Sequence, residues 1–205
     1  FDRGGRSVLG IRPLLWKNGW PVAGEVFKEG TYEIESERRG YALELAVDFV
    51  RMEYTRHRFW EKDDTPVVPL KSQTLEDVIE TWPQGKINVR IGDYMFRPHQ
   101  KWTITAVPNG GGYLGGPYYK IVIEGTNRAL AATAGAEIMT VPEFTGAPEQ
   151  LWRIDQLTDG TYRIMPKKVP GTDKELVLVS VGDSTPSLGI FDMNSDNSKW
   201  NFRDH

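Results

Sequence analysis

The chain has 205 residues, of which 39% are hydrophobic, so it is long and apolar enough for one large domain or two small ones. Its formal net charge of -3 provides no general attraction to nucleic acid or anionic membranes, and we expect neither as a partner. The absence of cysteine excludes disulfides, thiol catalysis and cysteine-ligated zinc, and no apolar run reaches the ~20 residues that span a bilayer.

Short runs of aromatic and β-branched residues, separated by 21 glycines and 13 prolines, predict an all-β protein with many tight turns. The first element is a hairpin within residues 1–27, with arms at 7–16 and 20–24. Between the arms, residues 18–19 are Asn-Gly, which is typical of a type I′ turn. Since a lone hairpin cannot bury itself, we expect residues 1–27 and 28–205 to belong to different domains.

Three units of similar pattern follow the hairpin, each of about 50 residues and each with a tryptophan near its end. The tryptophans are Trp102, Trp152 and Trp200, at intervals of 50 and 48 residues. Each unit has an aromatic opening strand, a second apolar strand, a third strand, and a short strand around the tryptophan. The opening strands are predicted at 30–34, 118–123 and 160–164, the second strands at 42–45, 129–132 and 176–179, and the third strands at 87–91, 137–141 and 187–191.

Four strands in each of three units make twelve, which is the strand count of a β-trefoil. A propeller also has about four strands per blade, but three blades lie below its usual range. Closing twelve strands into a barrel of approximate threefold symmetry removes exposed edges and gives the tryptophans a shared interior. We therefore expect the three tryptophans to be core residues and not ligand contacts.

The first unit departs from the pattern through an insertion at about residues 50–85. This insertion contains a predicted helix, which begins at the capping residue Thr74, ends at Trp82 and is followed by Pro83. The apolar face of the helix would consist of Leu75, Val78, Ile79 and Trp82.

Each tryptophan ends a short motif, Q-K-W at 100–102, Q-L-W at 150–152 and S-K-W at 198–200. The Q-x-W signature resembles that of the ricin B-type lectin family, also called carbohydrate-binding module family 13, and the resemblance covers residues 28–205. It implies a non-catalytic β-trefoil with one shallow sugar pocket per unit, a polysaccharide or oligosaccharide as partner, and no cofactor or metal.

The hairpin carries a second resemblance. Residues 11–16, Ile-Arg-Pro-Leu-Leu-Trp, and 19–22, Gly-Trp-Pro-Val, are similar to the final blade of the five-bladed propellers of glycoside hydrolase family 43. That family includes arabinanases and xylosidases, and its three catalytic carboxylates lie in earlier blades. The resemblance implies an upstream propeller as partner, an arabinan or arabinoxylan substrate, no catalytic residue on this chain, and a secreted, periplasmic or cell-surface location in a bacterium.

The ricin B-type resemblance also implies site residues. In sugar-binding trefoils an aspartate follows the leucine of the second strand, and here Glu44, Ala131 and either Val177 or Val179 stand at that position. The other candidates are Asp93, Tyr94 and His99 in the first unit, Glu143, Phe144, Glu149 and Gln150 in the second, and Phe191, Asp192, Asn194 and Asn197 in the third. The third set is the preferred pocket, because it combines an aromatic ring with short polar side chains in one turn.

Structural interpretations of the same residues stay open. Residues 192–197 are equally typical of a solvated turn with Asx-type hydrogen bonds. Gln100 and Gln150 are suited to supporting the local backbone, and Glu44 to an exposed position on a strand.

Three other sequence patterns give only weak evidence for a function. Residues 110–115 fit G-x-G-x-x-G, but a strand follows where a dinucleotide site needs a helix, so we expect a flexible connection. Three scattered histidines, His57, His99 and His205, do not predict a zinc site. Arginines at 51, 56 and 58 lie among acidic residues, which favours loop or inter-domain packing over nucleic-acid binding.

Three functional hypotheses follow. The chain is a module that holds a hydrolase at its polysaccharide, a structural accessory domain packed on the propeller, or one piece of an active enzyme whose other piece accompanies it.

Overall fold

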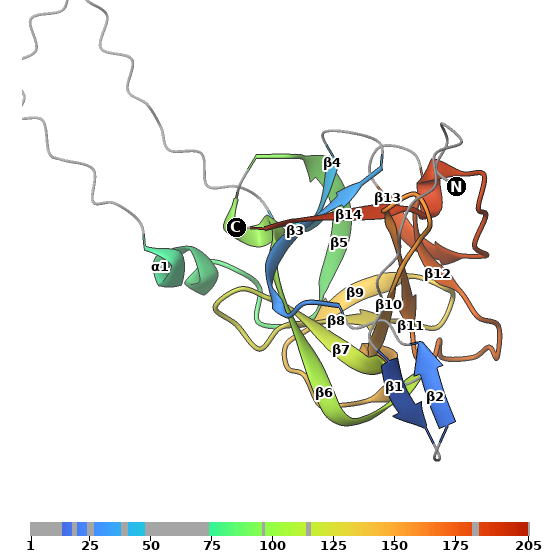
Figure 1. The fold of residues 1–205 in the computed structure, drawn as a ribbon. Helices are drawn as coiled ribbons and strands as arrows, with labels where there is room; N and C mark the ends of the chain where they lie inside the picture. Colours follow the sequence, from blue (N-terminus) through green and yellow to red (C-terminus); the bar gives the residue numbers. More distant parts are fainter. Residues whose placement is uncertain are drawn as a thin grey trace, which may run out of the picture.

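The computed structural model describes residues 14–17, 20–23, 27–37, 41–47, 74–95, 97–113, 116–181 and 185–204. The predicted turn at 18–19 and the arginines at 51, 56 and 58 lie outside the described residues. Strands β1 (Leu14–Lys17) and β2 (Trp20–Ala23) form an antiparallel two-stranded sheet of their own, with Lys17 opposite Trp20. The paired part of the predicted hairpin is therefore present, and it is separate from the main sheet (Figure 1).

Each of the three units contributes four strands, as the repeat predicts. The first unit consists of β3 (Gly30–Ser36), β4 (Tyr41–Leu45), β5 (Ile87–Asp93) and β6 (Lys101–Tyr113). The second consists of β7 (Gly116–Ile123), β8 (Ala129–Ala132), β9 (Ile138–Val141) and β10 (Trp152–Gln156). The third consists of β11 (Tyr162–Pro166), β12 (Val177–Val181), β13 (Thr185–Gly189) and β14 (Trp200–Asp204).

The first and fourth strands of the units form a closed barrel. Around its wall the pairs run β3–β6, β6–β7, β7–β10, β10–β11, β11–β14 and β14–β3, so the last strand returns to the first. The second and third strands pair as the hairpins β4–β5, β8–β9 and β12–β13. This topology is a β-trefoil, and the predicted fold is confirmed.

The three tryptophans lie in one core cluster, as expected. Trp102, Trp152 and Trp200 have no exposed surface. A buried indole N–H needs an acceptor, and each Nε1 donates to the carbonyl of the leucine in its own unit's second strand. The distances are 2.8 Å from Trp102 to Leu43, 2.9 Å from Trp152 to Leu130 and 2.9 Å from Trp200 to Leu178.

An aromatic plug closes one end of the core. The three opening strands place Tyr32, Tyr119 and Tyr162 opposite the tryptophans of their own units. The Phe27 ring packs on all three tyrosines, with centroid distances of 5.2, 6.0 and 5.5 Å. The Tyr119 hydroxyl also accepts from the backbone N–H of Phe27 at 2.8 Å and donates to its carbonyl at 3.1 Å. Phe27, the last residue of the predicted hairpin segment, thus packs within the trefoil.

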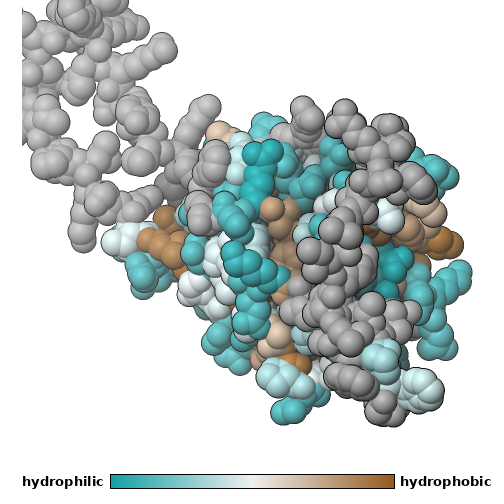
Figure 2. All heavy atoms as spheres, viewed as in Figure 1, coloured by the Kyte–Doolittle hydropathy of each residue, from teal (hydrophilic) through white to brown (hydrophobic). Residues whose placement is uncertain are grey.

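Helix α1 (Leu75–Glu80) is the predicted helix of the insertion and is shorter than expected. Thr74 caps it, and Asp77 completes a capping box. The half-buried hydrophobic side chains of α1 form a patch beside the barrel (Figure 2). Trp82 follows the helix and is buried.

Two boundaries differ from the sequence-based expectation. The third strand of the third unit ends at Gly189, which leaves Phe191 in the connection that follows it. The prediction of a flexible connection in residues 110–115 is wrong for its described part, because β6 continues to Tyr113. Gly112 pairs with Pro117 and Tyr113 with Gly116, after a register shift that begins at Val107. A bulge, and not a loop, accommodates the glycines here.

Candidate functional site: three strand-to-helix connections

The indole hydrogen bonds fix the position that the family resemblance assigns to the sugar-binding aspartate. Since each tryptophan donates to the leucine before that position, the equivalent residues are Glu44, Ala131 and Val179. Val177, the alternative in the third unit, is one residue before Leu178 and does not correspond. A carboxylate therefore stands at this position in the first unit and in neither of the others.

Glu44 is buried, with 5% of its surface exposed, so its placement as an exposed strand residue is wrong. Its Oε1 accepts from Arg90 Nε at 2.6 Å, and its Oε2 accepts from Gln100 Nε2 at 2.7 Å and lies 3.3 Å from His99 Nε2. Burial alone would raise the pKa of Glu44, but the hydrogen bonds from His99 and Arg90 outweigh burial and lower that pKa. The carboxylate is saturated by protein donors, and His99 is buried with it.

The Q-x-W glutamines hold the backbone of the connection before the tryptophan, as their structural interpretation predicts. Each ends a short 3-10 helix, η1 (Pro98–Gln100), η2 (Pro148–Gln150) or, for the serine of the third motif, η3 (Asp196–Ser198). Gln100 accepts from the Met95 N–H at 3.0 Å and donates to the Asp93 carbonyl at 2.7 Å.

The second and third units repeat this arrangement. Gln150 accepts from the Thr145 N–H at 2.7 Å and donates to the Glu143 carbonyl at 3.5 Å. Ser198 donates to the Asp192 carbonyl at 3.0 Å. Because Gln150 is buried, it supports the connection and does not present a polar group at the surface.

The described part of each connection contains a half-buried aromatic ring, and each of these rings lies against a cation. Arg203 lies 4.9 Å from the centroid of Tyr94, Lys120 lies 5.6 Å from that of Phe144, and Arg163 lies 5.3 Å from that of Phe191. Tyr94 is further fixed by its hydroxyl, which donates to Glu33 at 2.6 Å. Burial, and then that hydrogen bond, raise the pKa of Tyr94 to about 12.

The connection of the third unit is largely exposed. Asp192, Asn194 and Asn197 are exposed, and the side chains of both asparagines have no hydrogen-bond partner within the described residues. The Asn194 N–H donates to Asp192 Oδ1 at 2.9 Å, so the Asx-type turn is present. Two apolar side chains flank these residues, Ile190 with 76% and Met193 with 72% of their surface exposed.

The predicted site residues lie in three separate places, one in each unit, and in the first and second units part of each set is buried. Asp93 and Glu143 have exposed side chains, and Glu149 is half-buried. Sequence reasoning missed Ile190 and Met193, although their position beside Phe191 was a usable signal, since exposed apolar residues in a polar turn are unusual.

Among the described residues, no helix has the length and hydrophobicity to cross a membrane, and no three His, Asp or Glu side chains lie close enough to hold a metal ion.

Comparison with known proteins agrees with the topology. Residues 98–185 match the profile of a family described as ricin-type beta-trefoil lectin domain-like. No curated protein sequence matches the chain.

Three solved structures resemble the fold. A mosquitocidal holotoxin has a TM-score of 0.58 and 14% identity, over 87% of this chain and 18% of its own. The designed threefold symmetric protein ThreeFoil has a TM-score of 0.54 and 17% identity, over 86% of this chain and 100% of its own. Polyporus squamosus lectin, bound to a human-type influenza-binding epitope, has a TM-score of 0.52 and 17% identity, over 87% of this chain and 50% of its own. This chain thus spans a small part of the toxin and half of the lectin.

Proposed function

Because residues 98–185 match a ricin-type β-trefoil lectin-like family, we propose that the chain is a non-catalytic carbohydrate-binding module. Its contact surface is the third-unit turn, Phe191–Asn197. The observation that carries this proposal is the exposure of two asparagine amides, with unsatisfied hydrogen-bonding groups, beside the exposed side chain of Met193. A sugar offers hydroxyls to the amides and a C–H face to the apolar side chains.

The resemblance of residues 11–22 to glycoside hydrolase family 43 supports a proposal for the polysaccharide ligand and for the enzyme to which the module is attached. The module holds a secreted or cell-surface bacterial hydrolase at arabinan or arabinoxylan, and so raises the local concentration of substrate without chemistry of its own. The separate β1–β2 sheet supports this proposal, because a two-stranded sheet needs another surface to pack against.

Retention on immobilised polysaccharides tests the proposed surface. We expect the chain to bind arabinan or arabinoxylan, and Asn194→Ala and Phe191→Ala to weaken retention. Asn88→Ala, an exposed asparagine on β5, is the matched control and should leave retention unchanged. Lack of retention on every polysaccharide, with a native circular dichroism spectrum, contradicts the proposal.

A structural accessory domain is the alternative function. Two observations favour it, since Ala131 and Val179 replace the carboxylate of sugar-binding units and Glu44 is occupied by protein donors. Under this alternative the trefoil stabilises an adjoining propeller. Fusion to the propeller would then raise the melting temperature of the hydrolase, while the Phe191→Ala variant would have no effect on polysaccharide retention.

A further inference from the structure

The threefold symmetry provides an internal comparison between three outer faces of the barrel wall. In each fourth strand the residues one and three positions after the tryptophan lie on the opposite side of the strand from the buried indole, because successive side chains of a strand point to alternate faces. They lie opposite two residues of the next unit's opening strand. The pairs are Thr103–Val122 and Thr105–Lys120, then Arg153–Met165 and Asp155–Arg163, then Asn201–Glu35 and Arg203–Glu33.

On two of these outer faces, charged side chains form ion pairs with one another. Between the second and third units, Asp155 pairs with Arg153 at 2.6 Å and with Arg163 at 2.8 Å. Between the third and first units, Arg203 donates to both oxygens of Glu35, at 2.7 and 3.1 Å. Each of these faces therefore contains at least one arginine–carboxylate ion pair.

The face between the first and second units is different. Its charged residue is Lys120, and within the described residues no carboxylate lies at ion-pair distance from the Lys120 ammonium. The neighbouring group is the Phe144 ring, 5.6 Å away. Where the equivalent positions carry Asp155 and Arg203, this face carries the neutral Thr105. This face thus presents a cation that no described carboxylate of the protein pairs with.

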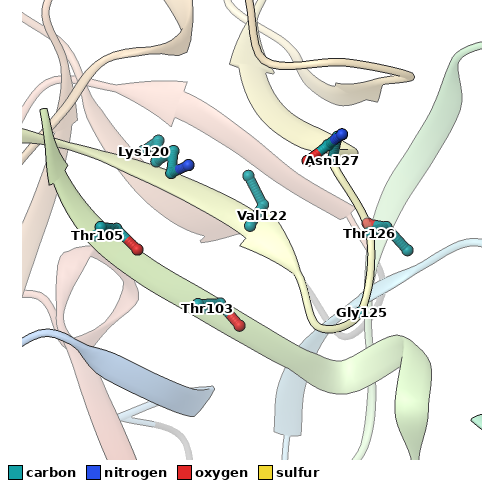
Figure 3. Close-up of a pocket in the computed structure, with 7 residues that line it drawn as sticks. All are labelled: Thr103, Thr105, Lys120, Val122, Gly125, Thr126 and Asn127. Atoms are coloured by element: carbon teal, nitrogen blue, oxygen red, sulfur yellow. The ribbon is translucent and has the colours of Figure 1, made fainter.

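A polar pocket of about 450 Å³ lies on this face. Figure 3 shows its wall, with Thr103 and Thr105 on β6, Lys120 and Val122 on β7, and the turn at residues 125–127. Thr103 shares a hydrogen bond with Thr31 at 3.0 Å. The hydroxyl of Thr105 and the amide of Asn127 have no partner within the described residues.

Helix α1 supports the turn from behind. Gly125 has a φ of +72°, and a Cβ at this residue would lie 3.1 Å from Leu75 and 3.3 Å from Ile79 of α1. The insertion of the first unit therefore packs closely against the turn of the second unit. The corresponding opening-strand connections of the other two units have no such helix against them in the described part of the chain.

We propose that this pocket, separate from the Phe191–Asn197 turn, binds an acidic sugar residue through its carboxylate. The Lys120 ammonium pairs with the carboxylate, while Thr105 and Asn127 bind ring hydroxyls and Val122 contacts the C–H face. This inference rests on the proposed carbohydrate-binding function and deepens it, since it names uronate-bearing polysaccharide as a ligand class.

Binding of tri-galacturonate and of neutral galactotriose to the full chain, measured by calorimetry, tests the proposal. We expect Lys120→Gln to weaken tri-galacturonate binding about threefold to tenfold and to leave any galactotriose binding unchanged. Lys86→Gln removes the same charge from an exposed lysine elsewhere and should bind as the parent does. Thr105→Val should weaken binding of the acid without altering its salt dependence.

Salt provides a second readout. Raising the ionic strength from about 0.05 to about 0.5 M should weaken tri-galacturonate binding to the parent, and this dependence should be lost in Lys120→Gln. Equal affinity of the parent and Lys120→Gln for tri-galacturonate would overturn the proposal, as would an equal loss in Lys86→Gln. Retention on arabinan with no tri-galacturonate binding refutes this site alone, whereas absence of both refutes the carbohydrate-binding function as well.

Discussion

At Gly92 the backbone of β5 passes directly beneath the carboxylate of Glu44. A Cβ at this residue would overlap the Glu44 carboxylate, which is held by Arg90 and Gln100. We expect Gly92→Ala to lower the free energy of unfolding by about 1–3 kcal/mol. The added methyl group would push the buried Glu44 carboxylate away from its hydrogen-bond donors. Urea denaturation measures this change. Gly85→Ala is the control, since a Cβ there meets nothing within 4 Å, and an equal loss in both variants would contradict the account.

Asp159 provides a pH-dependent contribution to stability. Burial alone would raise its pKa, but hydrogen bonds from Thr161 and from Lys199, at 2.9 Å, outweigh burial and lower the pKa to about 2. A folded-state pKa below the usual value of 3.8 means that the ionised form stabilises the fold. This contribution is complete above about pH 4 and is lost as the pH falls through about 2.

Asp159→Asn should therefore lower the free energy of unfolding at pH 7 by about 1 kcal/mol, a value reduced for the partial exposure of the side chain. The difference from the parent should shrink as the pH falls from 4 to 2. Urea titrations at a series of pH values measure it, with Asp173→Asn as an exposed control. A difference that is constant from pH 7 to pH 2 would show that the Lys199 ion pair does not contribute.

The sequence predicts the role of a single residue correctly where that residue type in that pattern has one common role. It does not do so where the residue type has two common roles. A tryptophan repeated at one strand position predicts a core, and the three indoles are buried. A carboxylate after a strand leucine is suited to ligand binding and to internal hydrogen bonding alike. The choice at Glu44 depends on Arg90 and Gln100, which are 46 and 56 residues away in the sequence.

At the scale of the element, helix α1 depends more on its cap than on burial. It has six residues, none of them fully buried, and the Thr74 hydroxyl accepts from the Asp77 N–H at 3.2 Å. We expect Thr74→Ala to destabilise this helix locally by about 1 kcal/mol and to leave the global unfolding transition nearly unchanged. Amide hydrogen exchange of residues 75–80 should become faster. Exchange that accelerates equally in the barrel strands would contradict the peripheral role of α1.

The strands were predictable as elements, and the connections between them were not. Short apolar runs bounded by turn residues locate the second and third strands to within about two residues, because a strand that packs against a core needs such side chains. Turn and bulge geometry depends on local backbone hydrogen bonds that leave a weaker trace in the sequence. Thus residues 110–113, whose glycines are typical of a loop, extend β6 past a bulge.

At the scale of the whole molecule, Phe27 joins the three units at one end of the barrel. Its ring contacts Tyr32, Tyr119 and Tyr162, one from each unit. We expect Phe27→Ala to lower the free energy of unfolding by about 3–5 kcal/mol, as for other large buried rings. Denaturant unfolding measures the loss. Trp20→Ala, at a residue with 75% of its surface exposed, is the control, and a loss below about 1 kcal/mol in Phe27→Ala would refute the role of the plug.

The threefold architecture follows from the sequence repeat, whereas the differences between the outer faces of the barrel do not. The partners Thr105 and Lys120 lie in different units, and which charges meet depends on strand register. The repeat specifies where tryptophans lie. It leaves the outward positions free to differ. There the unit boundaries carry ion pairs in two cases, and in the third a lysine with no carboxylate partner among the described residues.

Binding of carbohydrate by the third-unit turn can be measured by titrating the ¹⁵N-labelled chain with an arabinan-derived oligosaccharide and following the amide chemical shifts. We predict saturable shifts that are concentrated at residues 190–197 and small at the equivalent connections, 93–99 and 142–149. Saturable shifts that leave residues 190–197 unchanged, or no shift at any amide up to millimolar ligand, would contradict the claim.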